Sequence, residues 1–451
     1  MKNLLLTTCL LLVAMGSVLA QLPVLEQYIR QGLQSNLSLQ RQQQSLEKAQ
    51  LALQEAKGLF YPSLSFLSDY NYANGGRKID LPLGDLFNPI YQSLNQLQQG
   101  QKFSNIPNQQ VLFLPNNFQD TRLQASMALI NTEIWYNYKI HREMITQQQA
   151  MVNVYKRNLV KDLKAAYYNY LNSLRQQDIY NNAATLLKEQ YRSTSSLVNN
   201  GKALRGNLLK VDADIHQNDA LLTAATNDVQ VAKAYFNFLL NQPLETPIPA
   251  DTSVYAAALP DTVPALSAAA VTGRDELKVL QSGLTQTNLQ VKMKQAAYVP
   301  ELSTFINGGY QGTGYTFSSD QRYLFGGVSL KWTLFNGNQR RAQLKQAEVD
   351  RSSLQNQLAE TQQQLALELT TAQTNLHNAQ ARLGSALASQ SATREYYRET
   401  KVRYAEGLVL LLEVSDAFTQ FVNSQLAYQL ALTEVLTREA ELEQVTAAYP
   451  L

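Results

Sequence analysis

Residues 322–358 read RYLFGGVSLKWTLFNGNQRRAQLKQAEVDRSSLQNQL, and the spacing of their apolar side chains changes halfway. Before Asn336-Gly337 the large apolar residues fall on alternate positions, which is typical of a strand with one apolar face. These residues are Leu324, Val328, Leu330, Trp332 and Leu334. After Asn336-Gly337 leucine and alanine recur with a 3–4 spacing, which is typical of helices packed against helices. The stretch therefore predicts a strand followed by a helix.

The helical pattern continues to about Glu406, with leucine and alanine at the heptad positions and glutamine-rich flanks. A helix of this length would be a rod of about 100 Å, because each residue adds about 1.5 Å. A similar rod is predicted for 138–200. Proline is absent from 116–242 and from 301–449, which fits long helices and strands, since its ring breaks both.

The same order of patterns occurs twice along the chain. Tyr61-Pro62-Ser63-Leu64 recurs as Val299-Pro300-Glu301-Leu302 at an offset of 238, and Gly201 recurs as Gly407 at an offset of 206. We therefore predict a tandem duplication, with helix, strand, strand, helix and helix in each copy. Its parts are a first repeat over 21–242, a proline-rich linker over 243–264 and a second repeat over 265–451. Strands are expected at about 62–74, 121–135, 300–311 and 322–335, with a loop over 75–120 between the first two.

The first 20 residues have the pattern of a cleaved secretory signal. A basic start is followed by an apolar segment from Leu4 to Val13 and by small residues before Gln21. The only cysteine, Cys9, lies inside this segment, so the mature chain would have no disulfide.

The strands suggest how the chain could enter a membrane. No stretch has 18 consecutive apolar residues, whereas alternating strands of about 10 residues match the length that crosses a bilayer as β-structure. Four strands cannot close a barrel, and lipid tolerates no open edge, so several chains would have to combine. Three chains would give twelve strands, while two would give a narrow barrel of eight. The fold class predicted is therefore mainly α with a small membrane β part.

Composition and motifs argue against other classes of protein. The formal net charge is only +2, which does not favour nucleic-acid binding. His141, His216 and His377 are far apart and have no motif for metal binding or catalysis around them. Asp212 and Asp214 fall on different faces of a helix, and we expect them to be ordinary surface charges. No metal, cofactor or enzymatic activity is expected.

Taken together, the chain resembles the TolC-type outer-membrane factors, the outer membrane efflux protein family. The resemblance rests on the duplicated plan, the two strand entries at 61–64 and 299–302, Leu334-Phe335-Asn336-Gly337, and Tyr404-Ala-Glu-Gly407 followed by Glu413-Val-Ser-Asp416-Ala417. It implies a homotrimer in the bacterial outer membrane, with a 12-stranded β-barrel and a long α-helical barrel in the periplasm. It also implies a periplasmic adaptor (membrane fusion) protein and an inner-membrane pump as partners, and an exit duct for tripartite efflux or type I secretion as the function.

The resemblance further implies a gate at the periplasmic entrance. Tyr404 and Asp416 match gate residues of the family by position, while Glu413 stands in place of an aspartate and Val409 in place of an arginine. Three copies of Glu413 and Asp416 near the axis would form an acidic constriction that binds cations. The alternative is that both are solvated helix charges.

Aromatic residues cluster where strands are expected to end. Trp135, Tyr136, Tyr138 and Trp332 could form the girdle that aromatic side chains make at a membrane interface, or they could pack in a core. The 75–120 segment is most simply an extracellular loop.

Two other classes of function remain open from the sequence. A periplasmic coiled-coil scaffold without a pore would have the helices but no need of four strands of lipid-spanning length. An enzyme with a helical accessory region is disfavoured, because no catalytic constellation occurs. The sequence does not reveal the transported substrate.

Overall fold

A computed structural model describes residues 24–113, 116–258 and 273–451. The predicted signal peptide, including Cys9, and residues 259–264 of the predicted linker lie outside these residues. The chain divides into two compact units. The first is built from the described parts of 1–50, 143–285 and 351–451, and the second from 51–142 and 286–350. Each unit therefore combines segments of both predicted repeats.

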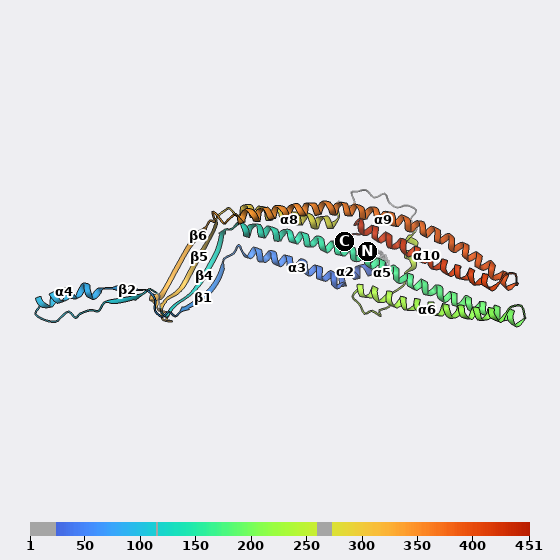
Figure 1. Cartoon of the computed structure of the whole chain (residues 1–451), viewed down its shortest axis with the longest axis horizontal. Coiled ribbons are helices and arrows are strands. Elements are labelled where there is room, and N and C mark those ends of the chain that lie inside the picture. Colours follow the sequence, from blue (N-terminus) through green and yellow to red (C-terminus); the bar gives the residue numbers. More distant parts are fainter. Residues whose placement is uncertain (1–23, 114–115, 259–272) are drawn as a thin grey trace, which may run out of the picture. The chain divides into compact units, whose positions relative to one another are not determined.

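Helices make up most of the chain, and four of them form two long hairpins. The first pair is α5 (Thr132–Asn199) and α6 (Arg205–Leu239), and the second is α9 (Gln339–Ala405) and α10 (Leu411–Val445) (Figure 1). The helices α2 (Val24–Ser35), α3 (Leu37–Gly58) and α8 (Asp275–Ala296) precede the strands, and a short 3₁₀ helix, η1 (Thr252–Ala258), follows α6. Among the described residues, no helix combines the length and the apolar character needed to cross a membrane.

The core of the first unit lies between helices at their apolar heptad positions. Leu163, Tyr167, Phe236, Leu240 and Val435 are fully buried there. Tyr167 also donates a hydrogen bond to the carbonyl oxygen of Pro249 over 3.0 Å, which ties the segment after α6 to α5. Leucine and alanine at the heptad positions in the middle of α9 join the same core, since Leu365, Leu369, Ala372, Leu376, Ala379 and Leu383 are all buried.

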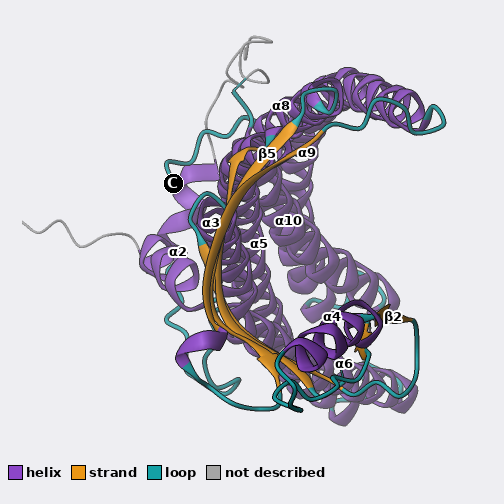
Figure 2. Ribbon diagram, turned by 90° about the vertical axis from the view of Figure 1, so that its left-hand side faces the viewer, coloured by secondary structure: helices purple, strands orange, loops and turns teal. Residues whose placement is uncertain are grey.

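The second unit contains an antiparallel sheet with the strand order β1-β4-β5-β6, whose strands curve together (Figure 2). The strands are β1 (Ser63–Asn71), β4 (Phe118–Ile130), β5 (Glu301–Thr313) and β6 (Arg322–Lys331). Because β1 and β6 each pair on one side only, the sheet has two free edges.

The two faces of this sheet differ in chemistry. Phe66 pairs with Leu123, Leu123 with Gly308, and Gly308 with Leu324, so these residues share one face. Most large side chains of this apolar face are more than half exposed in the single chain, including Leu64, Phe66, Leu324, Val328 and Leu330. The opposite face, which we call the polar face, carries mainly serine, glutamine, asparagine and charged residues. Its exceptions are Leu67, Phe118, Ala128, Phe305, Gly309, Thr313, Tyr323, Phe325 and Gly327.

The strand predicted over 121–135 is displaced, because β4 begins at Phe118 and ends at Ile130. The side-chain oxygen of Asn131 accepts a hydrogen bond from the amide of Ile134 over 3.1 Å. This bond satisfies a free donor at the start of α5, so the helix begins before Trp135 rather than after it.

The segment predicted as a loop over 75–120 is folded. It contains a second, two-stranded sheet of β2 (Lys78–Leu81) and β3 (Gln109–Leu112), with α4 (Leu83–Leu97) between them (Figure 1). The Asn88 side chain binds the backbone of Ile106 in both directions, at 2.8 and 2.9 Å, and fixes the return segment against α4. Tyr91 stacks on Phe103 with ring centroids 5.5 Å apart.

Outside this insertion, the described parts of both halves have the same order of elements. Helix (α2 and α3 in the first half, α8 in the second) is followed by two strands, a long helix and a second helix. The fold class predicted from the sequence, a mainly helical tandem duplication with four strands, is therefore confirmed.

Candidate functional site

The two helical hairpins turn through the same backbone geometry. Gly201 and Gly407 both have a positive φ, of 70° and 77°. In each turn the amide of the glycine and the amide of the next residue donate hydrogen bonds to carbonyl oxygens of the preceding helix. Leu204 and Leu410 then take extended conformations immediately before α6 and α10. The two glycines that were matched in the sequence therefore have the same backbone conformation at equivalent turns.

Large apolar side chains are exposed at these turns. Leu204, Leu209, Leu408, Leu410 and Leu412 are each more than 60% exposed. Several exposed leucines on two neighbouring turns are typical of a protein interaction site. The sequence signal for them is the Gly-Leu-Val-Leu-Leu-Leu run beginning at Gly407.

The predicted gate residue Tyr404 is buried near the turns. Its side chain packs in a cluster with Val211, Tyr397, Leu411 and Val414. The Tyr404 hydroxyl lies 3.4 Å from the hydroxyl of Thr194 on α5. Tyr404 therefore links the two hairpins of one chain.

Glu413 and Asp416 are exposed and lie three residues apart on α10, so they share a helix face. Glu413 accepts a hydrogen bond from the amide of Leu410 over 3.4 Å and thereby caps α10. Asp416 accepts one from Gln420 over 2.8 Å. The structure thus brings the two acids together on one exposed face but places Tyr404 in the core.

A second link between the hairpins was not foreseen. Asp214 on α6 accepts a hydrogen bond from Ser415 on α10 over 3.3 Å and forms an ion pair with Lys210. Its side chain is only 18% exposed, whereas that of Asp212 is 54% exposed. The expectation that both are ordinary surface charges is therefore wrong for Asp214. The i,i+4 spacing of Lys210 and Asp214 was the available signal, but the contact with Ser415 depends on tertiary packing.

Aromatic residues gather at the end of the sheet where β1 and β5 begin and β4 and β6 end. Trp135, Tyr136 and Tyr138 lie in the first turns of α5 rather than on a strand, and Trp332 directly follows β6. Both tryptophans are at least half exposed. The group also includes Phe60, Tyr61, Tyr298 and Phe335, which were not predicted from the sequence.

Specific contacts hold this group in place. Phe60 makes edge-on contacts with Trp135 and Tyr138, with ring centroids 6.3 and 5.8 Å apart. The Trp332 indole donates a hydrogen bond to the carbonyl oxygen of Tyr298 over 3.0 Å. The ammonium group of Lys139 lies 4.7 Å from the Trp135 ring centroid. Trp135 and Trp332 each combine an exposed ring with a polar partner, which suits a boundary between an apolar and an aqueous medium.

The other end of the sheet carries a second aromatic group. Tyr70 contacts Tyr315, and Tyr315 contacts Phe317, with ring centroids 6.2 and 5.3 Å apart. Phe317 also meets Tyr310 edge-on at 5.5 Å. The apolar face therefore lies between two aromatic groups. Tyr315 and Phe317 follow β5 in an irregular segment, so no alternation in the sequence predicts this second group.

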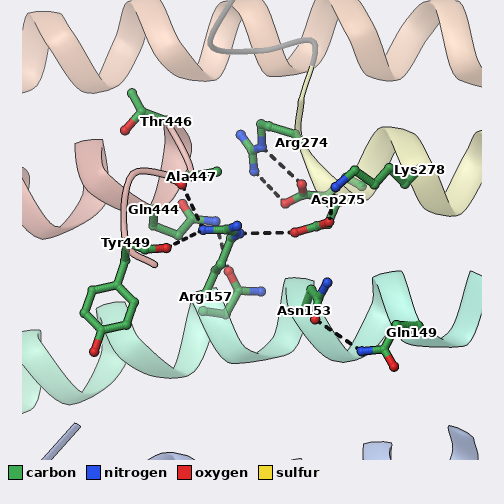
Figure 3. Close-up of polar contacts among 12 residues, drawn as sticks. Gln149, Asn153, Arg157, Arg274, Asp275, Lys278, Gln444, Thr446, Ala447 and Tyr449 are labelled. Atoms are coloured by element: carbon green, nitrogen blue, oxygen red, sulfur yellow. Dashed lines mark hydrogen bonds and ion pairs between the residues drawn. The ribbon is translucent and has the colours of Figure 1, made fainter. Parts of the chain in front are cut away.

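Buried charges join α5, α8 and the end of the chain in the first unit. Arg157 donates one hydrogen bond to Asp275 over 3.2 Å and two to the carbonyl oxygens of Ala447 and Tyr449, each over 2.9 Å (Figure 3). Burial alone would raise the pKa of Asp275, but hydrogen bonds from Lys278 and Arg157 lower that pKa below its usual value. Arg274 adds ion pairs to Glu276 and to Glu368 of α9. This network fixes where the second repeat starts against the first.

No group of histidine, cysteine, aspartate and glutamate suited to a metal ion occurs within the described ranges. The geometry instead consists of paired helical hairpins with apolar turns and an amphipathic sheet with two free edges. These features define a chain with the fold of an outer-membrane channel.

Comparisons with known proteins agree with this class. Residues 266–448 match the model of the family described as outer membrane efflux protein. The family resemblance and the outer-membrane localisation predicted from the sequence are thereby confirmed. No curated protein matches the chain.

Solved structures share the fold along almost the whole chain. The outer-membrane channel OprN superposes with a TM-score of 0.75 at 18% identity, covering 95% of this chain and 90% of its own. The outer membrane protein VceC of Vibrio cholerae gives 0.72 at 16%, covering 94% and 95%. The outer membrane channel CmeC of Campylobacter jejuni gives 0.76 at 13%, covering 94% and 85%.

Proposed function

We propose that the protein is the outer-membrane exit duct of an export system, through which substrates pass passively to the cell exterior. The observation that carries this proposal is the four-stranded sheet. Its apolar face is exposed, lies between two aromatic groups and belongs to strands of 9 to 13 residues. An apolar band between two aromatic girdles is the outer surface of a β-barrel in an outer membrane.

The two free edges indicate how the barrel closes. Unpaired backbone groups are not tolerated in the hydrocarbon region, so β1 and β6 must find partners. β1 and β6 run in opposite directions, so β6 of one copy can pair with β1 of the next as an antiparallel neighbour. Three copies then give a closed barrel of twelve strands, with the apolar face toward lipid and the polar face toward the lumen.

In this proposal the first unit lies in the periplasm and carries the entrance. The turns at Gly201 and Gly407 present exposed leucines, and we assign them to docking of a periplasmic adaptor protein that connects to an inner-membrane pump. Glu413 and Asp416 line the entrance on the exposed face of α10, while Tyr404 and Asp214 hold the two hairpins of each chain together.

Membrane fractionation and planar-bilayer recording together test the duct. The mature protein is expected in the outer-membrane fraction, to be trimeric in mild detergent and to form ion-conducting pores. Recovery in the soluble or inner-membrane fraction, or monomers that do not conduct, would contradict the proposal. A soluble trimer without conductance would favour the coiled-coil scaffold instead.

A further inference from the structure

A cluster of charges lies on the polar face, close to the end of the sheet that carries the insertion. Asp69 of β1 stands directly opposite Asp120 of β4. Arg122, two residues along β4, forms an ion pair with Asp120, and its guanidinium lies 3.6 Å from Asp69. The Tyr323 hydroxyl of β6 donates a hydrogen bond to Asp120 over 3.0 Å.

The arrangement leaves a net charge on the face. Like charges directly opposite each other on neighbouring strands are destabilising, and one arginine can neutralise only one of two carboxylates. Asp120 has both Arg122 and Tyr323 as partners and a side chain only 15% exposed. Asp69 is 59% exposed and has only the longer contact to Arg122. The cluster therefore presents about one negative charge to solvent from Asp69.

The other charged residues of the four strands do not cancel this charge. Glu301 and Lys331 pair directly with each other at the opposite end of the sheet. Arg322 pairs with Tyr310 and so lies on the apolar face, not on the polar face. The net charge of the polar face consequently comes from Asp69, Asp120 and Arg122.

The backbone beneath the cluster is closely packed. Gly309 of β5 pairs with Arg122, and a Cβ atom at Gly309 would lie 2.2 Å from the carbonyl oxygen of Thr121 and 2.6 Å from Cα of Arg122. A side chain at Gly309 would push β4 away, so glycine allows β5 to approach the strand that carries Asp120 and Arg122. The cluster is thus held in place from both neighbouring strands.

We propose that Asp69, Asp120 and Arg122 form a charge filter in the lumen of the barrel, which favours passage of cations over anions. This inference rests on the proposed function, which places the polar face toward the lumen. A threefold assembly then sets three net negative charges at one level, and rings of carboxylates are the device by which pores select cations.

Ionic strength gives the filter a signature. The screening length is about 30 Å at 10 mM salt but only about 3 Å at 1 M. A charge on the wall therefore acts across a wide lumen in dilute salt and has little effect in concentrated salt. Selectivity that arises from the cluster must fade as salt rises, whereas a purely steric restriction does not.

The test is the reversal potential of the reconstituted pore under a KCl gradient, at low and at high mean concentration. Asp69→Asn removes the exposed charge and is expected to lower the cation-to-anion permeability ratio by about twofold in dilute salt. Arg122→Gln leaves two carboxylates and is expected to raise it by a similar factor. Asp80→Asn serves as the matched control, because it removes the same charge from the exposed strand β2, which lies outside the four-stranded sheet.

The outcomes separate this inference from the duct itself. If the wild-type protein conducts but Asp69→Asn and Arg122→Gln shift the reversal potential no more than Asp80→Asn, the filter is refuted and the duct stands. If only Glu413→Gln or Asp416→Asn alters selectivity, the charge that matters lies at the entrance, which also refutes the filter. If the Arg122→Gln protein does not assemble, Asp69→Asn alone tests the filter, because Asp69 is exposed to solvent. Failure of the wild type to conduct would instead count against the duct.

Discussion

At the scale of single residues, burial decides which charged side chains contribute to the stability of the fold. Asp275 is only 2% exposed and binds both Arg157 and Lys278, which keep its pKa below the usual value. A group with a lowered pKa stabilises the folded state at pH values above its pKa in the unfolded chain. That contribution is lost as the pH falls through the lower pKa of the folded protein.

Asp275→Asn is therefore expected to cost about 2 kcal/mol at pH 7, since Arg157 then loses a charged partner. The difference from the wild type should shrink as the pH falls below about 4, where the unfolded chain protonates this residue. Thermal unfolding followed by circular dichroism at several pH values measures both effects. Asp212→Asn, at an exposed position, is the control and should change little. An equal loss at pH 3 and pH 7 would contradict this account.

Glu413 and Asp416, which we propose to line the entrance, give a second prediction at this scale. Combining Glu413→Gln with Asp416→Asn is expected to weaken block of the pore by a multivalent cation by about tenfold, because charge alone is removed from an exposed face. Block is measured as the cation concentration that halves the single-channel current. Glu406→Gln, an exposed change at the same turn, is the control. If block is unchanged in the double variant, neither acid lies in the lumen.

The sequence could name these residues only in part. Tyr404, Glu413 and Asp416 followed from a resemblance of local motifs, which gives the order of residues but not their burial. The buried position of Tyr404 and the link from Asp214 to Ser415 depend on how two hairpins pack, and no local pattern encodes that contact.

At the scale of elements, the turns between helices depend on glycine. Gly407 has a φ of 77°, a conformation that costs other residues about 1–2 kcal/mol. Gly407→Ala should therefore destabilise the α9–α10 hairpin by this amount in denaturant unfolding. Gly384→Ala, inside α9 with open space around it, should instead be neutral or stabilise by up to about 1 kcal/mol. Equal effects of the two changes would contradict the assigned turn.

A matched pair of glycines tests the sheet in the same way. Gly309→Ala would clash with the backbone of β4 and is expected to cost about 2 kcal/mol or more. Gly308→Ala meets only the end of the Leu324 side chain, at 3.5 Å, and should be tolerated. The fraction of protein recovered as folded oligomer in detergent measures the difference. Normal recovery of Gly309→Ala would show that β4 and β5 are not in this register.

Periodicity explains which elements were predictable. Alternation of apolar residues located all four strands of the main sheet, and the 3–4 spacing located the long helices. The predicted start of α5 was wrong because only one residue, Asn131, separates the end of β4 from the helix, and this residue caps the helix. The helix α4 was missed because Asn88 and Asn95, which read as loop residues, hold it through side-chain bonds to the segment after it.

At the scale of the whole molecule, one chain is an incomplete structure. Its sheet has free edges at β1 and β6, and its apolar face is exposed. The sequence indicated this incompleteness through simple geometry, since four strands cannot enclose a lumen. The charge cluster at Asp69 was not foreseen, because it arises from pairing across strands that are about 50 residues apart in the chain.

The measurement that tests the central claim most directly is cross-linking of the two free edges. Ser65 of β1 and Ser329 of β6 are exposed and each lies two residues from the same end of the sheet. With both changed to cysteine, a flexible bifunctional thiol reagent should convert the protein in outer membranes into covalent trimers. Each single variant should give none.

The control places Ser65→Cys with Gln124→Cys, which face each other within one chain, and should yield only internally linked monomers. Covalent trimers from the Ser65→Cys/Ser329→Cys protein, with no larger species, are the result predicted by a closed barrel of three chains. Monomers only, from cysteines shown to be reactive, or a ladder that extends beyond three chains, would contradict it.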